Sequence, residues 1–195
     1  MTEFQNDPFA AFALWFKEAT SSEPADPNAM TVATATRTGR PSARIALLKA
    51  WDERGFVFYT NLESRKSLEI RENPQVALLF HWKSLKRQVR IEGLAAQVSD
   101  EQADAYFATR PRISRLGAWA SAQSRPLADR ATFEARLREV EARFPTDSIP
   151  RPPFWSGWRI SPEVCEFWQD VDYRLHERIV FRRAAGGWEK SRLYP

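Results

Sequence analysis

The chain has 195 residues, a length that suits one domain with small appendages and allows most of the unfolded surface to be buried. Hydrophobic residues make up 43% of it, with 8 Trp and 13 Phe, which excludes a disordered protein. The formal net charge of +4 is compatible with two partner classes, nucleic acids and small phosphorylated ligands, because Lys and Arg attract both.

Cys165 is the only cysteine, which excludes an internal disulfide and favours a reducing, cytoplasmic compartment. The first residues lack the pattern of a signal peptide, and no apolar run is long enough to span a bilayer, so we expect no membrane association. His81 and His176 belong to no metal-binding spacing. We therefore expect no metal site.

The N-terminal segment predicts a short helix. Asp7 can cap it, Pro8 suits its first position, and the aromatic run 9–16 gives it an apolar face. Residues 21–27 contain Ser, Pro and Asp and indicate a linker. We divide the chain into a helix and linker at 1–25 and a single domain at 26–195.

Five segments then have the composition of strands, at 30–36, 43–49, 56–60, 76–82 and 88–98. Turn residues at 38–41 and 52–55 separate the first three, which is hairpin spacing. The runs 45–48 and 56–59 are continuously apolar, so we expect burial on both faces, by helices or by another subunit.

Helices are predicted at 64–73, at 99–109 behind the Ser99-x-x-Gln102 capping box, and after Asp129, where apolar residues recur at helical spacing. Four prolines make 145–153 extended. Further strands are expected at 157–161, 164–169, 178–183 and 188–193. The whole pattern indicates an α+β fold, an antiparallel barrel with peripheral helices.

Basic residues border two of these elements. Arg44 and Lys49 flank an apolar strand, while Arg65 and Lys66 begin a helix, where free backbone N–H groups favour a phosphate. Solvated strand and helix ends would explain the same pattern.

Three other groups could carry chemistry. Gln88 shares one strand face with Arg90, and Tyr106 shares a helix face with Arg110, with Ser114 just beyond. In the segment 174–178, His176 could act as an acid or base between arginines. Exposed surface and a structural histidine remain the alternatives, and no nucleophile elbow, Walker loop or dinucleotide motif is present.

Taken in order, these groups resemble the pyridoxamine 5′-phosphate oxidase family. The matching stretches are Asp26–Met30, Arg44–Lys49, Phe58–Asn61, Ser64–Lys66, Arg87–Val89, Gly117–Trp119, Gln123–Ser124, Pro153–Trp155, Phe167–Gln169, Arg174–His176 and Arg192–Pro195. They span nearly the whole chain. The resemblance implies an FMN-binding split β-barrel and a homodimer with active sites at the interface.

The resemblance also implies site residues. FMN would be held from one subunit by Arg44, Ile45, Ala46, Leu47, Leu48, Lys49, Tyr59, Thr60, Arg65, Lys66 and Gln88, and from the partner by Gln123, Ser124, Trp168 and Arg178. The substrate phosphate would meet Lys49, Tyr106, Arg110 and Ser114, and the catalytic residues Arg174 and His176, with Leu175 between them, would lie over the substrate ring.

The implied reaction is the oxidation of pyridoxamine or pyridoxine 5′-phosphate to pyridoxal 5′-phosphate, with O2 as acceptor and release of H2O2. Three features depart from the family: Asp170-Val171 stand where glycine is usual, Glu177 replaces an aspartate, and the N-terminal segment is short. The first puts the local turn in question, because a bulkier residue restricts positive φ. Alternatives are a phenazine-type flavin oxidase, a non-catalytic flavin or pyridoxal-phosphate binder, and a nucleic-acid binder around 83–90.

Overall fold

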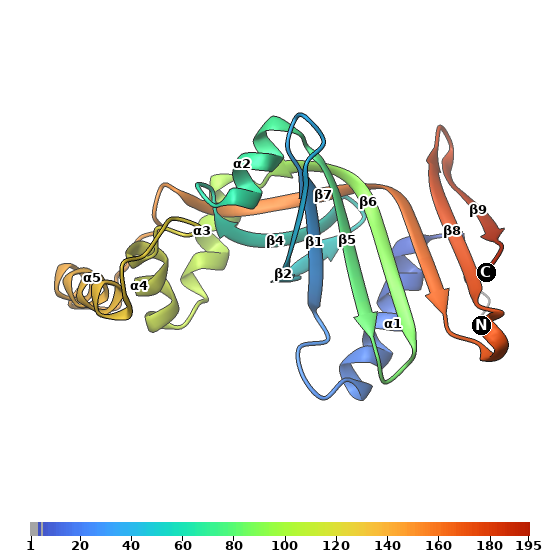
Figure 1. The fold of residues 1–195 in the computed structure, drawn as a ribbon, viewed down its shortest axis with the longest axis horizontal. Coiled ribbons are helices and arrows are strands. Elements are labelled where there is room, and N and C mark those ends of the chain that lie inside the picture. The colour runs from blue at the N-terminus through green and yellow to red at the C-terminus, as the bar shows by residue number, and fades with distance from the viewer. Residues whose placement is uncertain (1–3, 5) are drawn as a thin grey trace.

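The computed structural model describes residue 4 and residues 6–195 (Figure 1). Its helices are α1 (Pro8–Ser22), α2 (Arg65–Glu72), α3 (Asp100–Ala108), α4 (Arg112–Ala120) and α5 (Arg130–Arg143), with a 3₁₀ turn η1 (Asp172–Arg174). Its strands are β1 (Ala29–Ala35), β2 (Pro41–Leu47), β3 (Ala50–Asp52), β4 (Gly55–Asn61), β5 (Gln75–Trp82), β6 (Arg87–Gln97), β7 (Trp155–Gln169), β8 (Glu177–Ala184) and β9 (Gly187–Leu193).

The strands form one curled antiparallel sheet in the order β2-β1-β5-β6-β7-β4-β3, with β8 and β9 continuing from β7. The first part of β7 pairs with β4 and its last part with β8, while β6 pairs along both parts. The predicted α+β fold with an antiparallel barrel and peripheral helices is confirmed.

β7 corrects the two strands predicted at 157–161 and 164–169, because the chain continues through Pro162. Proline lacks the N–H that a ladder needs, and the register between β6 and β7 shifts between Glu92 and Gly93, opposite this point. A Cβ on Gly93 would lie 2.1 Å from the carbonyl oxygen of Ser161, so only glycine allows this approach. β7 therefore continues as one strand past this irregularity.

The main core lies between α1 and the sheet. Trp15 is fully buried, and the ring of Phe12 packs edge-on against Phe56 and Phe80 with centroids 4.9 and 5.2 Å apart. Asp7 accepts a hydrogen bond from the Phe9 amide, which confirms the predicted cap. The segment that we separated at 1–25 therefore shares the core of the sheet.

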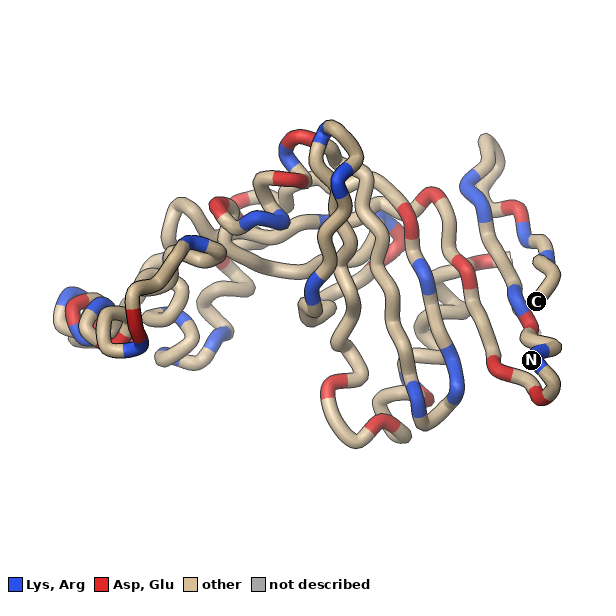
Figure 2. The backbone as a smooth tube through the Cα atoms, in the orientation of Figure 1, with Lys and Arg blue, Asp and Glu red and all other residues tan. Residues whose placement is uncertain are grey.

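A second hydrophobic cluster forms a helical lobe around Phe107, Leu116 and Trp155, with α5 packed on its outside. α5 begins at its predicted cap, Asp129, yet none of its residues is fully buried. Both α4 and the short strand β3 were missing from the prediction. Figure 2 shows acidic and basic residues mixed along α5, which is typical of a solvated helix.

Among the residues described, no helix has the length and apolar character needed to cross a membrane.

Candidate functional site

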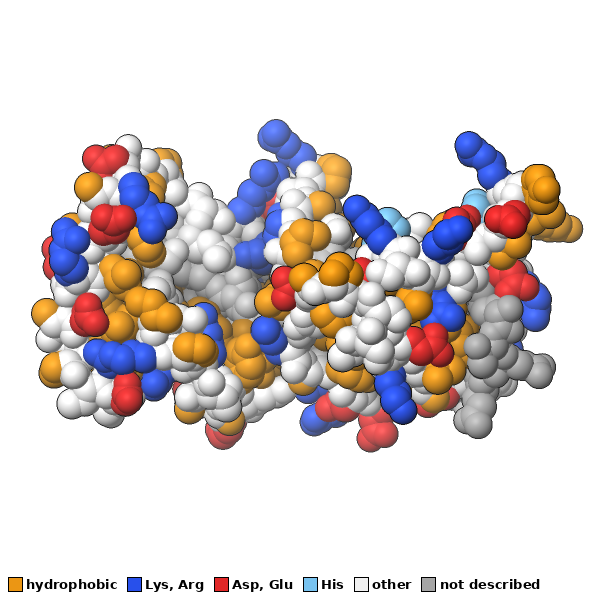
Figure 3. All heavy atoms as spheres, turned by 90° about the horizontal axis from the view of Figure 1, so that it is seen from below, with side chains coloured by type: hydrophobic (Ala, Val, Ile, Leu, Met, Phe, Trp, Pro, Cys, Tyr) orange, Lys and Arg blue, Asp and Glu red, His pale blue; other side chains and the backbone are white. Residues whose placement is uncertain are grey.

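A cavity of about 480 Å³ lies between the helical lobe and the strands β2 and β4. Figure 3 shows the surface hollowed between the lobe and the sheet. Its walls combine apolar residues with a few polar groups, as expected of a small-molecule site. They comprise Ile45, Ala46, Leu47, Lys49, Tyr59, Thr60, Asn61, Lys66, Tyr106, Arg110, Ser114, Gly117, Ala118, Ser121, Gln123 and Trp155.

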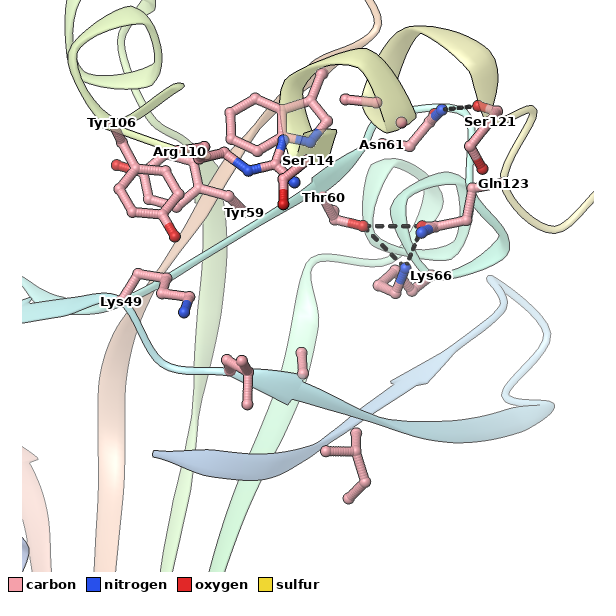
Figure 4. Close-up of a pocket in the computed structure, with 16 residues that line it drawn as sticks. Lys49, Tyr59, Thr60, Asn61, Lys66, Tyr106, Arg110, Ser114, Ser121 and Gln123 are labelled. Atoms are coloured by element: carbon pink, nitrogen blue, oxygen red, sulfur yellow. Dashed lines mark hydrogen bonds between the residues drawn. The ribbon is translucent and has the colours of Figure 1, made fainter. Parts of the chain in front are cut away.

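One end of the cavity is built on the first turn of α2 (Figure 4). The Lys66 ammonium donates to Gln123 Oε1 at 2.8 Å and to Thr60 Oγ1 at 2.9 Å. Burial, together with the nearby charge of Arg44, lowers the pKa of Lys66 to about 8. Because burial disfavours the charged form of Lys66, an anionic ligand beside its ammonium would stabilise that form.

Behind this end, the Glu69 carboxylate joins α2 to β1 and β2. It accepts hydrogen bonds from Thr34 and Ser42 and pairs with Arg65 Nε at 2.9 Å and Arg44 Nη2 at 3.5 Å. Burial disfavours the ionised carboxylate, but the hydrogen bonds from Ser42, Thr34 and Arg65 outweigh this effect and lower the pKa of Glu69 to about 2. Glu69 therefore remains ionised and fixes two cations close to the cavity.

The other end of the cavity is lined by Lys49, Tyr106, Arg110 and Ser114 (Figure 4). The Arg110 guanidinium lies 4.8 Å from the centroid of the Trp155 ring, and burial lowers its pKa. Arg110 Nη1 is buried and has no hydrogen-bond partner within the described part of the chain. An unpaired cationic donor in a cavity wall fits an oxyanion such as a phosphate.

Two stacked tyrosines lie at the Arg110 end of the cavity (Figure 4). The rings of Tyr59 and Tyr106 lie 4.0 Å apart at 14°, and burial raises the pKa of both hydroxyls. The Trp155 ring is nearly parallel to both tyrosine rings, with its centroid 5.4 Å from that of Tyr59 and 6.2 Å from that of Tyr106. The cavity thus offers a flat aromatic wall beside the cationic group of Arg110.

Gln88, Trp168 and Arg178 lie elsewhere, around a second cavity of about 320 Å³ on β6, β7 and β8. Arg178 Nε donates to Glu166 Oε1 at 2.7 Å, and Glu166 also accepts from Arg90. The predicted polar face of β6 is confirmed, since Val89 and Ile91 point into the core on its other side.

Arg174 is the last residue of η1, and Leu175 and His176 connect it to β8. Positive φ falls at Tyr173 (58°) and Arg174 (63°), so the turn does not require it at Asp170 or Val171. Leu175 is 64% exposed. The imidazole of His176 packs against the Trp168 ring, with centroids 4.6 Å apart.

The structure therefore gathers the predicted site residues into two groups. Around the first cavity lie Ile45, Ala46, Leu47, Lys49, Tyr59, Thr60, Lys66, Tyr106, Arg110, Ser114 and Gln123, with Arg44, Arg65 and Ser124 beside them. The second group comprises Gln88, Trp168, Arg174, Leu175, His176 and Arg178. Leu48 points into the main core.

This arrangement corrects the division of residues between subunits. Gln123 was expected to come from the partner, but it bonds to Lys66 of its own chain, and Ser124 Oγ accepts from the amide of Arg65 at 3.2 Å. Gln88, which we assigned with Lys66, lies with Trp168 and Arg178 instead. The burial expected on both sides of 45–48 is absent in the single chain, because Ile45 is 65% exposed.

The basic stretch 83–90 is balanced by acidic groups. Arg87 pairs with Glu18, and Arg90 pairs with Glu92 at 3.0 Å and with Glu166 at 2.6 Å. These carboxylates weaken the positive field that a nucleic acid would need.

Two family models together cover most of the chain. The model described as "Pyridoxamine 5'-phosphate oxidase" matches residues 16–144, and that described as "Pyridoxine 5'-phosphate oxidase C-terminal dimerisation region" matches residues 155–195. The chain belongs to the pyridoxamine 5′-phosphate oxidase family. It is an oxidoreductase of this family, as the resemblance implied.

Curated relatives extend the match over the full length. The pyridoxine/pyridoxamine 5′-phosphate oxidase of Granulibacter bethesdensis is 62% identical, covering 97% of this chain and 92% of the relative. That of Gluconobacter oxydans is also 62% identical, covering 100% and 98%.

Solved structures of the oxidase family confirm the fold. PhzG from Burkholderia lata, solved in complex with tetrahydrophenazine-1-carboxylic acid, has a TM-score of 0.92 at 31% identity, over 98% of this chain and 94% of its own. An FMN-binding protein from Nostoc punctiforme has a TM-score of 0.75 at 18% identity, over 95% of both chains, and supports the fold alone.

The residues lining this first cavity that the sequence analysis did not assign to the site are Asn61, Gly117, Ala118, Ser121 and Trp155. Asn61 Nδ2 donates to the carbonyl of Ser121 at 3.3 Å and so ties β4 to the end of α4. Glu69 was missed as well. Asn61, Trp155 and the pair Gly117-Ala118 lie in stretches that carried the family resemblance, whereas no motif distinguishes Ser121 or Glu69.

Proposed function

We propose that this oxidase converts pyridoxamine 5′-phosphate and pyridoxine 5′-phosphate to pyridoxal 5′-phosphate, with FMN as cofactor and O2 as acceptor. The observation that carries the proposal is the cavity with two separate cationic ends, Lys66 at one and Arg110 with Lys49 at the other. A phosphorylated cofactor and a phosphorylated substrate together need two such ends.

The Lys66 end suits the cofactor. Arg65 and Lys66 stand at the start of α2, and Glu69 keeps the guanidinium groups of Arg44 and Arg65 beside it. Free backbone N–H groups and the positive end of the helix dipole add to their attraction for a phosphate. The volume of about 480 Å³ lies in the range of cofactor sites.

The Arg110 end suits the substrate phosphate. Its buried Nη1 has no partner in the described chain, and Ser114 and the Tyr106 hydroxyl line the same wall. A bound phosphate would satisfy this donor by a charge-assisted hydrogen bond. The neighbouring aromatic rings would then orient a planar pyridine beside the cofactor.

A second copy of the chain would complete each site. Arg110 lies just before α4, whereas Arg174 and His176 lie just before β8. Because α4 and β8 stand at opposite ends of the molecule (Figure 1), Arg174 and His176 cannot reach the Arg110 of their own chain. The matched dimerisation region, residues 155–195, contains both residues together with Trp168 and Arg178. Exposed Ile45 and Leu175 are the kind of surface that a partner covers.

When bound, FMN would supply the redox chemistry, a two-electron oxidation at C4′ of the substrate with O2 as final acceptor and H2O2 as its product. Arg174 and His176 would hold the substrate ring against the cofactor. His176 would also accept or donate a proton.

The hypothesis of a phenazine-type flavin oxidase has one observation in its favour, the similarity to PhzG at a TM-score of 0.92. The chain is 31% identical to PhzG and 62% identical to the B6 phosphate oxidases. The substrate end also carries Arg110, Lys49, Tyr106 and Ser114, which a substrate without phosphate does not require. B6 phosphates are therefore the better candidates.

An oxygen-dependent assay tests the proposal. The FMN-loaded protein should form pyridoxal 5′-phosphate and equimolar H2O2 from both B6 phosphates, whereas the unphosphorylated vitamers should react poorly. Absence of bound flavin after loading would exclude the whole family of flavin functions. Flavin binding without turnover would leave a binding protein, and turnover of a reduced phenazine carboxylate alone would favour the PhzG-like reaction.

A further inference from the structure

A carboxylate contacts the histidine of the second group. Asp170 follows directly after β7, and its Oδ1 lies 3.0 Å from His176 Nδ1. The side chains of the two residues are 37% and 22% exposed, and the imidazole packs on Trp168. Position 170 is one where the sequence departs from the family's usual glycine, which has no side chain to offer.

Asp170 is held firmly in this position. Its amide donates to the carbonyl of Lys86 at 2.9 Å. The preceding Gln169 donates from Nε2 to the carbonyls of Leu85 and Lys86 and accepts from Arg87 Nε at 2.7 Å. The turn between β5 and β6 therefore anchors the backbone that carries the carboxylate.

The pair constrains the proton on the imidazole. An ionised carboxylate only accepts hydrogen bonds, so a bond between Asp170 Oδ1 and His176 requires a proton on Nδ1. The amide of Val171 also points at Nδ1, at 3.4 Å, and would require that nitrogen to be unprotonated. The carboxylate contact is shorter and charge-assisted, so it decides the tautomer.

We propose that Asp170 is a positioning residue that keeps His176 in the tautomer with the proton on Nδ1 and fixes the plane of its ring. The neutral ring then presents Nε2 as its acceptor. That this nitrogen faces the substrate rests on the proposed function, whereas the tautomer rests on the geometry of the pair. A carboxylate behind a histidine commonly sets the tautomer and orientation of the ring in this way.

Nuclear magnetic resonance can read the tautomer without any assay of activity. The chain has two histidines, so a His81→Gln variant of the FMN-loaded, 15N-histidine-labelled protein assigns the spectrum. At a pH where the ring is neutral, the two-bond 15N–1H pattern of His176 should be that of the Nδ1–H form. In Asp170→Ala, and in Asp170→Gly if the alanine variant does not fold, it should shift toward the Nε2–H form.

Asp172→Asn is the matched control, because it removes a negative charge two residues away while leaving the Asp170 pair intact. Its His176 pattern should match that of the wild type. An Nε2–H pattern in the wild type, or the same pattern with and without the Asp170 carboxylate, would overturn the proposal.

Kinetics give the consequence for the reaction. Asp170→Ala should lower kcat/KM for pyridoxamine 5′-phosphate about 10-fold and leave the affinity for FMN unchanged. A loss of this size is common when a functional histidine loses the carboxylate that orients it. Asp172→Asn should keep the wild-type value. If the wild type does not oxidise B6 phosphates, the proposed function fails, while the NMR spectrum still tests the tautomer. If the wild type oxidises them but the His176 pattern does not depend on Asp170, only the tautomer proposal fails.

Discussion

The half-buried guanidinium of Arg110 gives the substrate end of the cavity its charge, and its loss should affect the substrate alone. We expect Arg110→Ala to raise KM for pyridoxamine 5′-phosphate about 10- to 100-fold, the range for losing charged hydrogen bonds. FMN affinity, measured by fluorescence quenching, should stay constant because Lys66 holds the opposite end.

Arg136→Ala is the control for Arg110, since it removes the same charge from an exposed position on α5. Its KM should equal that of the wild type. Equal KM values in Arg110→Ala and wild type would show that the phosphate binds elsewhere.

At the cofactor end, the lowered pKa of Lys66 predicts a pH dependence. Lys66 loses its charge as pH rises through about 8, and a neutral amine attracts phosphate less than an ammonium does. We expect the Kd of FMN to rise about 10-fold between pH 7 and pH 9.5. Fluorescence titration at each pH measures it.

Lys66→Arg separates this effect from other titrations, because arginine stays charged throughout that range. The variant should bind FMN with a nearly constant Kd above pH 8. A parallel rise of Kd in both proteins would assign the dependence to another group.

Single residues were predictable where their chemistry is unusual for their place. Arg65 and Lys66 at a helix start, and Arg110 four residues after Tyr106, could be singled out from the sequence, although α3 ends at Ala108 and Arg110 lies beyond it rather than on its face. Glu69 could not, because its role depends on Thr34, Ser42 and Arg44, which come from two other strands. The same holds for Asp170, whose contact with His176 depends on the turn at η1.

Between elements, Glu69 is the link that docks α2 onto β1 and β2. With its pKa near 2 in the folded protein, against 4.5 ordinarily, its ionised form contributes stability above about pH 4.5. That contribution is lost as pH falls toward 2. We expect Glu69→Gln to lower the free energy of unfolding by about 1–2 kcal/mol at pH 7, because Arg44 and Arg65 are partly exposed and screened.

Urea unfolding at pH 7, 5 and 3 measures this linkage. The difference between Glu69→Gln and wild type should narrow as pH falls, since protonation removes the same charge from the wild type. Glu72→Gln, an exposed position on the same helix, should change stability little at any pH. A difference for Glu69→Gln that is independent of pH would contradict the assignment.

Elements were predictable where turn residues and periodicity agree. The strands from β1 to β6 and the caps at Asp7, Ser99 and Asp129 follow such signals, except β3. The prediction divided β7 into two strands at Pro162. The sequence does not show that Gly93 lies opposite Pro162 and lets the two strands approach there. α4 was missed because it follows Pro111 directly, without a side chain that caps its first turn.

At the scale of the molecule, the sheet separates residues that one substrate would need together. Arg110 belongs to the helical lobe, while Arg174 and His176 lie next to β8 at the far end (Figure 1). No sequence pattern states this separation, since it follows from the path of β7 across the sheet. The separation makes an interface site a requirement of the proposed function.

Mixing two variants, assayed at a substrate concentration low enough that each alone is nearly inactive, tests that requirement. Arg110→Ala and Arg174→Ala each spoil both sites of a symmetric dimer, but a hybrid dimer carries one site with both arginines intact and one with neither. Random pairing makes half of the dimers hybrid, so the mixture should recover about a quarter of the wild-type activity.

The two chains are co-expressed with different tags, and hybrids are isolated by tandem affinity purification. Recovered activity at about half the wild-type value in pure hybrids fits sites shared between chains, whereas hybrids as inactive as their parents would mean that each chain supplies both arginines to its own site.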